Sequence, residues 1–479
     1  MKNDSLAFDL ENAFAVQHEN SRRHITVAWE IRADRLCRLQ TMLRNNRAPI
    51  AQAISDDFGY RSRQETEMLE FFACFEAIAN ALEHGKCWMR LQGRATGFWF
   101  LPGRSMVMPQ PLGVVGIVSP WNYPLSLCVG PLASALAAGN RAMIKPSELT
   151  PRFAALFAEL IHQSFDAAEV VVINGDAAVS QAFCALPFDH LLFTGSTAVG
   201  HHVMRAASDN LTPVTLELGG KSPAIIGPGA DFEHAVKRIM AGKLLNAGQT
   251  CIAPDYVLLP AGQEQRFIES ARKVVGDFYP QLNLQSTADA AIPAFTTIIN
   301  DRHFARLQNL VMEASSIGAA VHLLSNAEPD PASRLMPPLA LTGIPADAKI
   351  MSEEIFGPLL PLVGYASLDD ALAYVTARAR PLALYIFERE QAAIDKILQG
   401  TVAGGVTIND TLLHFSQEDL PFGGVGMSGM GAYHGRAGFD TFSHLKPVFR
   451  QSRINGMDLL NPPYGKKLEY MLKLLVRGK

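Results

Sequence analysis

The sequence alternates short β-rich runs with helical patterns over two long stretches. In residues 113–218 the runs are VVGIV, RAMIKP, VVVI, HLLFTG and VTLEL. A second series over residues 222–407 contains PAIIG, YVLLP, AAVHLL, LLPLVGY, LALYIF and GGVTI, again with helical patterns between them. This alternation predicts right-handed βαβ units and parallel sheets covered by helices. We therefore expect two doubly wound α/β domains that meet near Gly219 and Gly220.

The flanking segments follow other patterns. Residues 19–91 alternate charged and apolar helical faces, and residues 95–111 alternate large apolar residues around Pro102-Gly103, as a hairpin or ribbon does. The last segment, 465–479, is expected to form an amphipathic helix, with one face made of Leu468, Met471, Leu472 and Leu475. We expect this helix to dock on the protein rather than to touch a membrane surface or the substrate mouth.

Charge and hydropathy exclude several classes of protein. The 42 basic and 46 acidic residues leave a net charge of −4, so there is no basic field for nucleic acid. The uncharged stretch between Arg104 and Arg141 is long enough to span a bilayer, but its prolines and glycines predict a buried strand, turn and helix instead. The N-terminus lacks the features of a signal peptide, so we expect a cytoplasmic protein.

The six cysteines are widely spaced and form no C-x-x-C pair, which fits neither a zinc site nor a disulfide framework. The 13 histidines show no metal-binding spacing either, so no metal site is expected. Cys37, Cys74, Cys128 and Cys184 are expected to be small buried residues. Cys251 differs because it ends the polar run NAGQTC, beside a hydroxyl and close to a glycine.

Two glycine-rich stretches compete for the phosphates of a dinucleotide. Residues 424–429 match G-x-G-x-x-G, but without a convincing strand before them or a helix after them they are expected to be a closely packed loop. FTGSTAVG, residues 193–200, has Thr197 in place of the middle glycine, yet a β-rich run precedes it and a helical pattern follows. Glu217 lies about 20 residues further on, and spacing leaves open whether it holds a ribose or acts as a base.

Six motifs occur in order along nearly the whole chain: PWNYP (120–124), IKPSE (144–148), FTGSTAVG (193–200), LELGGK (216–221), NAGQTC (246–251) and EEIFGP (353–358). In this order and spacing the sequence resembles the NAD(P)-dependent aldehyde dehydrogenase superfamily. Residues 409–448 are similar to the branch that contains the coniferyl aldehyde dehydrogenases and the class 3, or fatty aldehyde, enzymes.

The resemblance implies an aldehyde dehydrogenase-like α/β fold with a β-ribbon oligomerisation arm and at least a homodimer. The implied domains are listed by residue: 1–82 and 110–218 for NAD binding, 219–410 for catalysis with the nucleophilic cysteine, 83–109 and 411–450 for the arm and a bridging segment, and 451–479 for the amphipathic tail.

The resemblance also implies the roles of individual residues. Cys251 is the nucleophile, Glu217 the general base, and Asn122 a donor to the oxyanion together with the backbone amide of Cys251. The implied cofactor-binding residues are Lys145 and Glu148 at the adenosine ribose, Gly195, Ser196 and Gly200 near the pyrophosphate, Trp121 along the cofactor, and Glu354 and Phe356 at the nicotinamide ribose.

Aldehyde oxidation needs residues of these types. A thiolate makes the aldehyde carbon tetrahedral so that it can release a hydride, donors hold the oxyanion, and a base activates the water that releases the acid. A carboxylate at Glu148 would bind a free 2′-hydroxyl and repel a 2′-phosphate, so we expect NAD to be preferred over NADP. The expected substrates are aromatic aldehydes such as coniferaldehyde, or medium to long aliphatic aldehydes.

Other interpretations remain open at this point. The thioester could pass to coenzyme A, or the chain could be a non-catalytic relative, although Cys251, Glu217 and Asn122 are intact. A thiol hydrolase is a third option, without a cysteine-linked histidine signature to support it. Individually, Glu217 could pair with Lys221, and Lys145 could be a surface lysine at the end of a strand.

Overall fold

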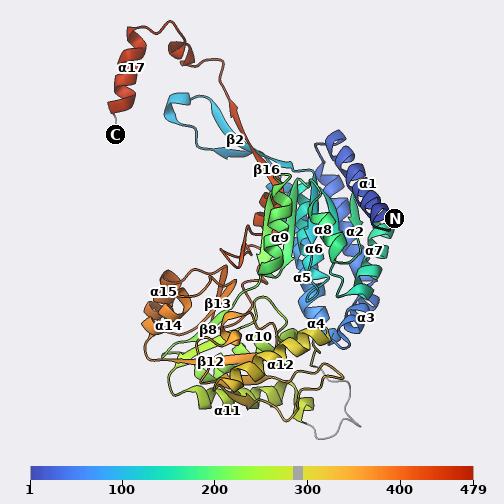
Figure 1. Cartoon of the computed structure of the whole chain (residues 1–479). Coiled ribbons are helices and arrows are strands. Elements are labelled where there is room, and N and C mark those ends of the chain that lie inside the picture. Colours follow the sequence, from blue (N-terminus) through green and yellow to red (C-terminus); the bar gives the residue numbers. More distant parts are fainter. Residues whose placement is uncertain (1, 284–294, 478–479) are drawn as a thin grey trace.

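Two sheets organise the chain, one above the other in Figure 1. The computed structural model describes residues 2–283 and 295–477. The first sheet has six strands in the spatial order β15 (Gly429–Met430), β7 (Val214–Leu218), β6 (His190–Gly195), β3 (Val114–Val118), β4 (Arg141–Lys145) and β5 (Val170–Val172). All neighbours are parallel except β15, which pairs antiparallel with β7.

Helices cover both faces of the six-stranded sheet. On one face lie α1 (Lys2–Arg23), α8 (Ala177–Cys184) and α9 (Thr197–Ser208), and on the other lie α6 (Ser126–Ala138), α7 (Pro151–Ser164), α2 (Trp29–Asn45), α3 (Arg47–Phe58) and α5 (Phe72–Trp88), preceded by the short α4 (Arg63–Thr66). The strand order reverses between β3 and β6. In open α/β sheets, ligands bind in the crevice that such a reversal leaves at the carboxyl ends of the strands.

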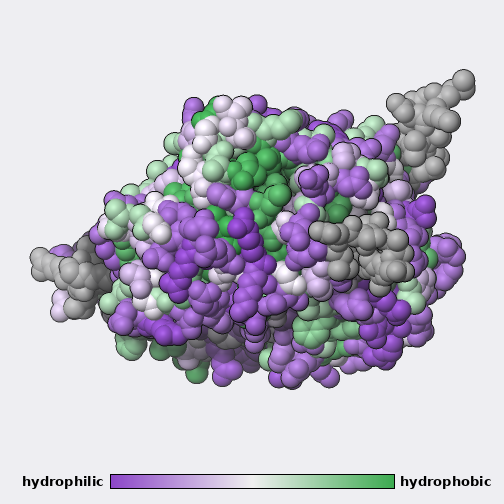
Figure 2. Space-filling model, turned by 90° about the horizontal axis from the view of Figure 1, so that it is seen from below, coloured by the Kyte–Doolittle hydropathy of each residue, from purple (hydrophilic) through white to green (hydrophobic). Residues whose placement is uncertain are grey.

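The second sheet has seven strands in the order β10 (Ala320–Leu323), β11 (Leu339–Thr342), β12 (Leu359–Tyr365), β9 (Tyr256–Pro260), β8 (Pro223–Ile226), β13 (Ala383–Phe387) and β14 (Gly405–Ile408). Only β10 runs antiparallel to its neighbour. The helices that alternate with the strands of this seven-stranded sheet are α10 (Phe232–Leu244), α11 (Glu264–Phe278), α12 (Asp301–Ser316), α13 (Lys349–Ser352), α14 (Leu368–Thr376) and α15 (Gln391–Gly400). Figure 2 shows the molecule from below relative to Figure 1, and most of the surface in that view is hydrophilic. The prediction of two doubly wound α/β domains is confirmed.

The uncharged stretch predicted to be buried forms the strand β3 and the helix α6. Every residue of β3 is buried, and so is every residue of α6 except Gly130. An apolar helix without a polar face is stable only when it is enclosed on all sides, as α6 is here. Within residues 2–283 and 295–477, no helix is long and apolar enough to cross a membrane.

An antiparallel ribbon extends from the two-sheet body (Figure 1). It consists of β1 (Gln92–Arg94), β2 (Arg104–Pro111) and β16 (Ser443–Arg450), and α16 (Gly435–Thr441) leads into β16. The predicted ribbon arm is therefore present. The terminal helix α17 (Lys466–Arg477) lies beyond the arm, and Leu472 is 45% exposed. The expectation that it docks on the body of its own chain is wrong, because the residues after β16 continue along the arm away from both sheets.

The burial of the cysteines differs from expectation at one position. Cys74, Cys128 and Cys184 are buried as predicted, but Cys37 is exposed. It lies on α2 directly after the buried Leu36, and a step of one residue turns a helix by about 100°, which here reaches the solvent face.

Candidate active site

The six-stranded sheet brings four of the predicted motifs to one edge. PWNYP follows β3, IKPSE spans the end of β4, FTGSTAVG spans the end of β6, and Glu217 is the penultimate residue of β7. We call this the carboxyl edge. Parallel strands place their carboxyl ends at the same edge of a sheet, so these motifs lie around the crevice at the strand-order reversal.

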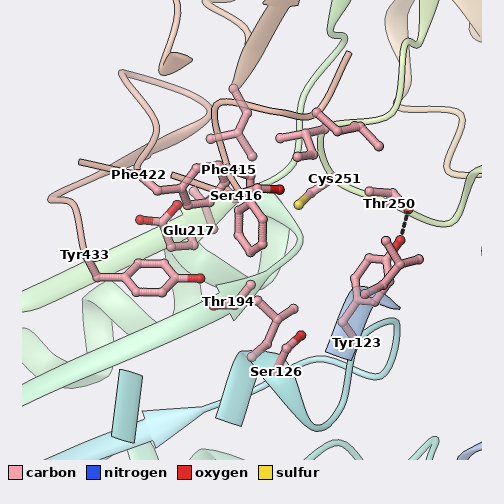
Figure 3. Close-up of a pocket in the computed structure, with 16 residues that line it drawn as sticks. Tyr123, Ser126, Thr194, Glu217, Thr250, Cys251, Phe415, Ser416, Phe422 and Tyr433 are labelled. Atoms are coloured by element: carbon pink, nitrogen blue, oxygen red, sulfur yellow. Dashed lines mark hydrogen bonds between the residues drawn. The ribbon is translucent and has the colours of Figure 1, made fainter. Parts of the chain in front are cut away.

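The two remaining motifs come from the seven-stranded sheet, where they precede strands instead of following them. NAGQTC leads towards β9 and EEIFGP leads into β12. We call this the amino edge. One cavity is lined from both edges, by Thr194 and Glu217 on one side and by Thr250 and Cys251 on the other. Figure 3 shows the Cys251 sulfur and the Glu217 carboxylate at this shared space.

The thiol is presented by a loop with unusual backbone geometry. Asn246, Ala247 and Gly248 have φ values of 52°, 52° and 74°. A left-handed φ is costly for alanine and is kept only where the surroundings enforce it. A Cβ on Gly248 would lie 2.4 Å from the carbonyl oxygen of Gly357, so this position also needs glycine because of the close approach.

Gln249 is the buried side chain that enforces the loop. Its Nε2 donates to the carbonyl oxygens of Asn246 at 3.0 Å and Thr297 at 3.1 Å, and its Oε1 accepts from the amide of Ile299 at 3.0 Å. The side chain is completely inaccessible to solvent. Sequence reasoning did not assign Gln249 a role, although it lies inside the NAGQTC motif.

Asn122 lies against the same loop. Its Nδ2 donates to the carbonyl oxygen of Gln249 at 3.2 Å, and its own carbonyl oxygen accepts from Asn246 Nδ2 at 3.1 Å. An amide nitrogen carries two hydrogens, so one N–H of Asn122 remains for another acceptor. The structure thus places the predicted oxyanion donor next to the loop of Cys251.

A buried ion pair that sequence reasoning missed supports the PWNYP segment. Arg61 and Glu70 have fully buried side chains, with Arg61 Nη1 2.8 Å from Glu70 Oε1. The same Nη1 donates to the carbonyl oxygen of Asn122 at 3.0 Å, while Glu70 Oε2 accepts from the amides of Leu125 at 2.7 Å and Ser126 at 3.0 Å. In the sequence, these charges resemble the solvated face of a helix, so no local signal identifies them.

Burial dominates the electrostatics of the two reacting groups. Glu217 is 3% exposed, and neither of its carboxylate oxygens has a hydrogen-bond partner among the described residues. Burial raises the pKa of Glu217 well above its ordinary value. Burial also raises the pKa of Cys251 to about 12, with Glu354 and Glu217 adding to the rise and the backbone amides of Cys251 and Ile252 opposing it. A positive charge placed beside the thiol would lower its pKa.

The cavity around these groups is mainly apolar and aromatic. Its walls include Leu127, Phe415, Phe422 and Tyr433. The Tyr123 hydroxyl does not point freely into the space, because it is hydrogen-bonded to Thr250 Oγ1 at 2.5 Å (Figure 3).

A second cavity, of about 590 Å³, lies between the start of α9 and the EEIFGP motif. Thr197 at the start of α9 borders it, and the first-turn amides of a helix of this length attract phosphate. Glu354 borders it as well, and a Cβ on Gly219 would lie 1.9 Å from Glu354 Oε2, so only glycine leaves room for that carboxylate. Burial raises the pKa of Glu354 to about 8.

Gly195, Ser196 and Gly200, the residues expected near the pyrophosphate, differ from one another in their surroundings. Gly195 ends β6, and Ser196 caps α9 by accepting from the amide of Val199 at 3.4 Å. Gly200 is buried in the first turn of α9, where a Cβ would lie 2.7 Å from Leu218 Cδ2. The structure therefore gives Gly200 a packing role between helix and sheet.

Lys145 and Glu148 lie at the end of β4. The Lys145 side chain is buried, which shows that its interpretation as a surface lysine is wrong, and its Nζ donates to the carbonyl oxygen of Pro146 at 2.7 Å. Burial lowers the pKa of Lys145, and the charge of Glu148 opposes that shift. Glu148 itself is exposed.

The EEIFGP motif is held by charged groups that lie outside it. Lys221 pairs with Asp255 rather than with Glu217 and donates to the carbonyl oxygen of Glu353 at 3.0 Å. Phe356 has a φ of 49°, and its ring meets that of Trp121 edge-on at 5.4 Å. Trp121 and Phe356 are thus in contact across the two edges.

The loop that matches G-x-G-x-x-G is closely packed, as expected. A Cβ on Gly424 would lie 1.9 Å from the carbonyl oxygen of Ser428, and Gly429 pairs with Glu217 in the sheet. The carbonyl oxygen of Met427 accepts from Thr197 Oγ1 at 3.1 Å, so the loop borders the site. In the part of the chain that the structure describes, no group of three or more His, Cys, Asp or Glu side chains could hold a metal ion.

The chain is similar to known proteins over most of its length. Residues 4–448 match the aldehyde dehydrogenase family. A probable coniferyl aldehyde dehydrogenase of Pseudomonas aeruginosa is 48% identical over 441 residues, 92% of this chain and 90% of that protein. Mouse aldehyde dehydrogenase family 3 member A2 is 46% identical over 343 residues, 72% of this chain and 68% of that protein. The substrate-bound AldH of Staphylococcus aureus has a TM-score of 0.90 at 37% identity, covering 97% of this chain and 99% of that chain. The chain therefore belongs to the aldehyde dehydrogenase family of NAD(P)-dependent enzymes, as its six motifs predicted.

Proposed function

We propose that the protein oxidises an aromatic aldehyde of the coniferaldehyde type, or a medium- to long-chain aliphatic aldehyde, to the carboxylic acid. Family membership supports the reaction class. The observation that carries the proposal is the single apolar cavity lined by Cys251 from one sheet and Glu217 from the other. A nucleophile and a base brought together in a space with few polar groups suit a reaction in which water must enter only at the last step.

In the first step, the Cys251 sulfur attacks the aldehyde carbon and the carbonyl oxygen becomes an oxyanion. The free N–H of Asn122 and the backbone amide of Cys251 are the donors for this oxyanion. Glu217, in the same cavity, is the group that can take the thiol proton. Transfer of the thiol proton to the Glu217 carboxylate leaves one buried charge in the cavity. Ionising the thiol beside a charged Glu217 would leave two.

In the second step, the tetrahedral carbon loses a hydride and a thioester remains on Cys251. A nicotinamide bound in the site would supply the acceptor for this hydride. The residues of this chain that would hold that end of the cofactor are Glu354, through the ribose hydroxyls, and Trp121 and Phe356, whose rings contact each other. NAD is preferred over NADP in this proposal because Glu148 is an exposed carboxylate at the ribose end.

In the third step, after the thiol proton on Glu217 has been released to solvent, the Glu217 carboxylate removes a proton from water as the water oxygen attacks the thioester carbon. The carbon–sulfur bond breaks, the acid leaves, and the Cys251 thiolate takes that proton from Glu217. Both oxygens of the Glu217 carboxylate lack a protein partner among the described residues, which leaves them available for a water molecule.

The first experiment measures absorbance of the reduced nicotinamide with coniferaldehyde, benzaldehyde, hexanal and decanal, with NAD and with NADP. Cys251→Ala is the control. Acid formation without coenzyme A, lost in the control, supports the proposal. Product that forms only when coenzyme A is added identifies an acylating enzyme instead. No turnover of any aldehyde by folded protein that binds NAD indicates a non-catalytic relative.

We also propose a homodimer assembled through the arm. Phe98, Trp99 and Phe449 are large apolar side chains exposed on or beside the ribbon, with Trp99 59% exposed. Exposed apolar residues gathered on an extended element are typical of protein interfaces. Sedimentation should give a dimer for the intact chain and a monomer for Trp99→Asp, while a dimer in both would place the interface elsewhere.

A further inference from the structure

One segment beside the seven-stranded sheet contacts both the NAGQTC loop and the EEIFGP motif. Residues 297–307 lead into α12 and form its first two turns. Near the start of this segment, the carbonyl oxygen of Thr297 and the amide of Ile299 bond the buried side chain of Gln249 at 3.1 and 3.0 Å. Near its end, Arg306 donates to the backbone of EEIFGP. The segment therefore connects the support of the nucleophile with the motif expected at the nicotinamide ribose.

The EEIFGP motif has no regular secondary structure and takes several of its hydrogen bonds from side chains. It occupies residues 353–358, between α13 and β12. Buried backbone groups outside helices and sheets need other partners. Arg306 Nη1 donates to the carbonyl oxygen of Glu354 at 3.1 Å, and its Nη2 donates to that of Ile355. Asp255 Oδ1 accepts from the amide of Ile355 at 3.0 Å. The backbone that carries the Glu354 side chain is thus held by residues distant in the sequence.

The guanidinium of Arg306 suits this task better than an ammonium would. Its N–H groups form a planar fork, so two of its nitrogens can donate to two neighbouring acceptors at the same time. The group is half-buried, and burial lowers its pKa while the charges of Glu354, Glu353 and Asp255 oppose the shift. Burial raises the pKa of Glu354, and the charge of Arg306 is among those that oppose the rise. Arg306 thus acts on Glu354 through its charge as well as through the backbone.

The neighbours of Arg306 pack α12 against the same motif. A Cβ on Gly357 would lie 2.4 Å from Leu307 Cδ2, so glycine is needed for this close approach. One turn earlier on the helix, the His303 ring lies 5.2 Å from the Trp121 ring, which itself meets the motif edge-on. These contacts leave little freedom for the first two turns of α12 to move relative to EEIFGP. The hydrogen bonds of Arg306 therefore have a fixed origin.

We propose that Arg306 is a positioning residue for hydride transfer. Through two carbonyl oxygens it fixes the Glu354 carboxylate, which would bind the ribose next to the nicotinamide. Residues 297–307 relate that carboxylate to the Gln249 side chain, and so to the Cys251 sulfur. The distance between the substrate carbon on the sulfur and the hydride acceptor is then set by contacts around one sheet. This inference rests on the proposed function, in which Glu354 contacts the ribose.

A general structural role is the alternative for Arg306, and the two roles predict different losses. Loss of a structural support should weaken every reaction of Cys251 as well as thermal stability. Loss of positioning should affect only the steps that need a cofactor. Cys251 and Glu217 line the first cavity, whereas Glu354 borders the second one. A reaction of the thiol that needs no cofactor therefore separates the two roles.

The test compares the wild type with Arg306→Met and Arg306→Lys. Calorimetry gives the Kd of NAD. Stopped-flow absorbance gives the hydride-transfer rate with the best aldehyde of the panel, unlabelled and deuterated at the aldehyde carbon. Hydrolysis of 4-nitrophenyl acetate without cofactor reports on the thiol, which takes the acetyl group, releases 4-nitrophenol and is freed by water. Arg302→Met, at an exposed arginine on the same helix, is the matched control.

Arg306→Met should bind NAD more weakly and slow hydride transfer by about a hundredfold, the cost of misplacing a reacting group by about 1 Å. The deuterium isotope effect on kcat should rise, because hydride transfer becomes rate-limiting. Arg306→Lys should be intermediate, because lysine keeps the charge without the planar fork. Ester hydrolysis should stay at the wild-type rate in all variants.

Two results would overturn the inference. One is a wild-type NAD affinity and hydride-transfer rate in Arg306→Met, and the other is an equal loss of aldehyde oxidation and ester hydrolysis. If Arg306→Met does not fold, as judged by thermal unfolding, the same comparison for Arg306→Lys decides. Wild-type oxidation of aldehydes together with equal rates in Arg306→Met and Arg302→Met rejects this inference alone, whereas no oxidation of any aldehyde by the wild type rejects the proposed function.

Discussion

The carboxyl edge of the six-stranded sheet and the amino edge of the seven-stranded sheet contribute to one site by different structural means. At the carboxyl edge, Glu217 lies in a regular strand and the motifs that follow β3, β4 and β6 have ordinary backbone conformations. At the amino edge, Asn246, Ala247 and Phe356 have positive φ values. A strand end is positioned by the sheet itself, whereas a loop that precedes a strand needs buried side chains such as Gln249 to hold it. The position of the nucleophile Cys251 thus depends on buried side-chain contacts more than the position of the base Glu217 does.

The largest expected effect is at the amino edge. Cys251→Ala should abolish aldehyde oxidation, because removing a covalent nucleophile removes the reaction path and not only part of its stabilisation. NAD binding, measured by fluorescence or calorimetry, should persist because the second cavity does not include Cys251. Cys37→Ala, at the exposed cysteine, is the control and should keep full activity. Residual cysteine-independent oxidation would assign the nucleophile to another residue.

At the carboxyl edge, Glu217→Gln should slow steady-state turnover by roughly a hundredfold to ten-thousandfold, the usual contribution of a general base. Because Glu217 also takes the thiol proton in the proposed first step, the burst of reduced nicotinamide should be slowed as well. Stopped-flow absorbance separates the burst from the steady rate. A burst that keeps its wild-type rate would show that another group accepts the thiol proton.

The pH dependence follows from the burial of Glu217. Its pKa is raised, so the carboxylate form that acts as a base is present only as the pH rises through that raised value. The rate of thioester hydrolysis should therefore increase with pH as this carboxyl titrates, well above the ordinary range of a glutamate, and this increase should disappear in Glu217→Gln. Stability has the opposite dependence: burying this carboxyl favours its neutral form, so its effect on folding becomes less favourable as the pH rises above the pKa of the unfolded state. A rate increase that persists in the variant belongs to another group.

The buried ion pair of Arg61 and Glu70 should contribute to the free energy of unfolding. Arg61→Met leaves Glu70 buried without its cation, and breaking such a pair typically lowers the free energy of unfolding by about 3–5 kcal/mol. Denaturant unfolding measures the loss, and Arg63→Met, whose side chain is 66% exposed, is the matched control. Because Arg61 also donates to the carbonyl oxygen of Asn122, activity should fall at temperatures where the variant is still folded. Equal stability of the two variants would show that the pair is not a determinant of the fold.

The smallest expected effect is on cofactor choice at the carboxyl edge. Glu148→Gln removes an exposed negative charge, which should improve NADP relative to NAD by about 1 kcal/mol, or roughly fivefold, the size of a charge interaction near 4 Å in water. The ratio of kcat/KM for the two cofactors measures this change. Glu159→Gln, an exposed acid on α7, is the control. Equal or better use of NADP by the wild type would overturn the predicted preference.

Much of the fold and part of the site could be predicted from the sequence. The alternation of β-rich runs and helical patterns predicted both sheets, and the resemblance carried by six motifs predicted the family. The glycine loop at 424–429 was also correctly predicted to be a closely packed loop. The position of α17 and the exposure of Cys37 were predicted wrongly, because an amphipathic or apolar pattern does not specify what a segment packs against.

The sequence by itself determined the local elements and the residue types needed for aldehyde oxidation, because periodicity, turns and motif spacing are short-range properties of the chain. Only the tertiary structure decided which distant groups meet. Asn122 and Gln249 are 127 positions apart, and Arg61 reaches Asn122 from 61 positions away. Such contacts depend on how helices and sheets pack, as does the burial of Glu217. Burial and pKa are properties of that packing, so no local pattern in the sequence encodes them.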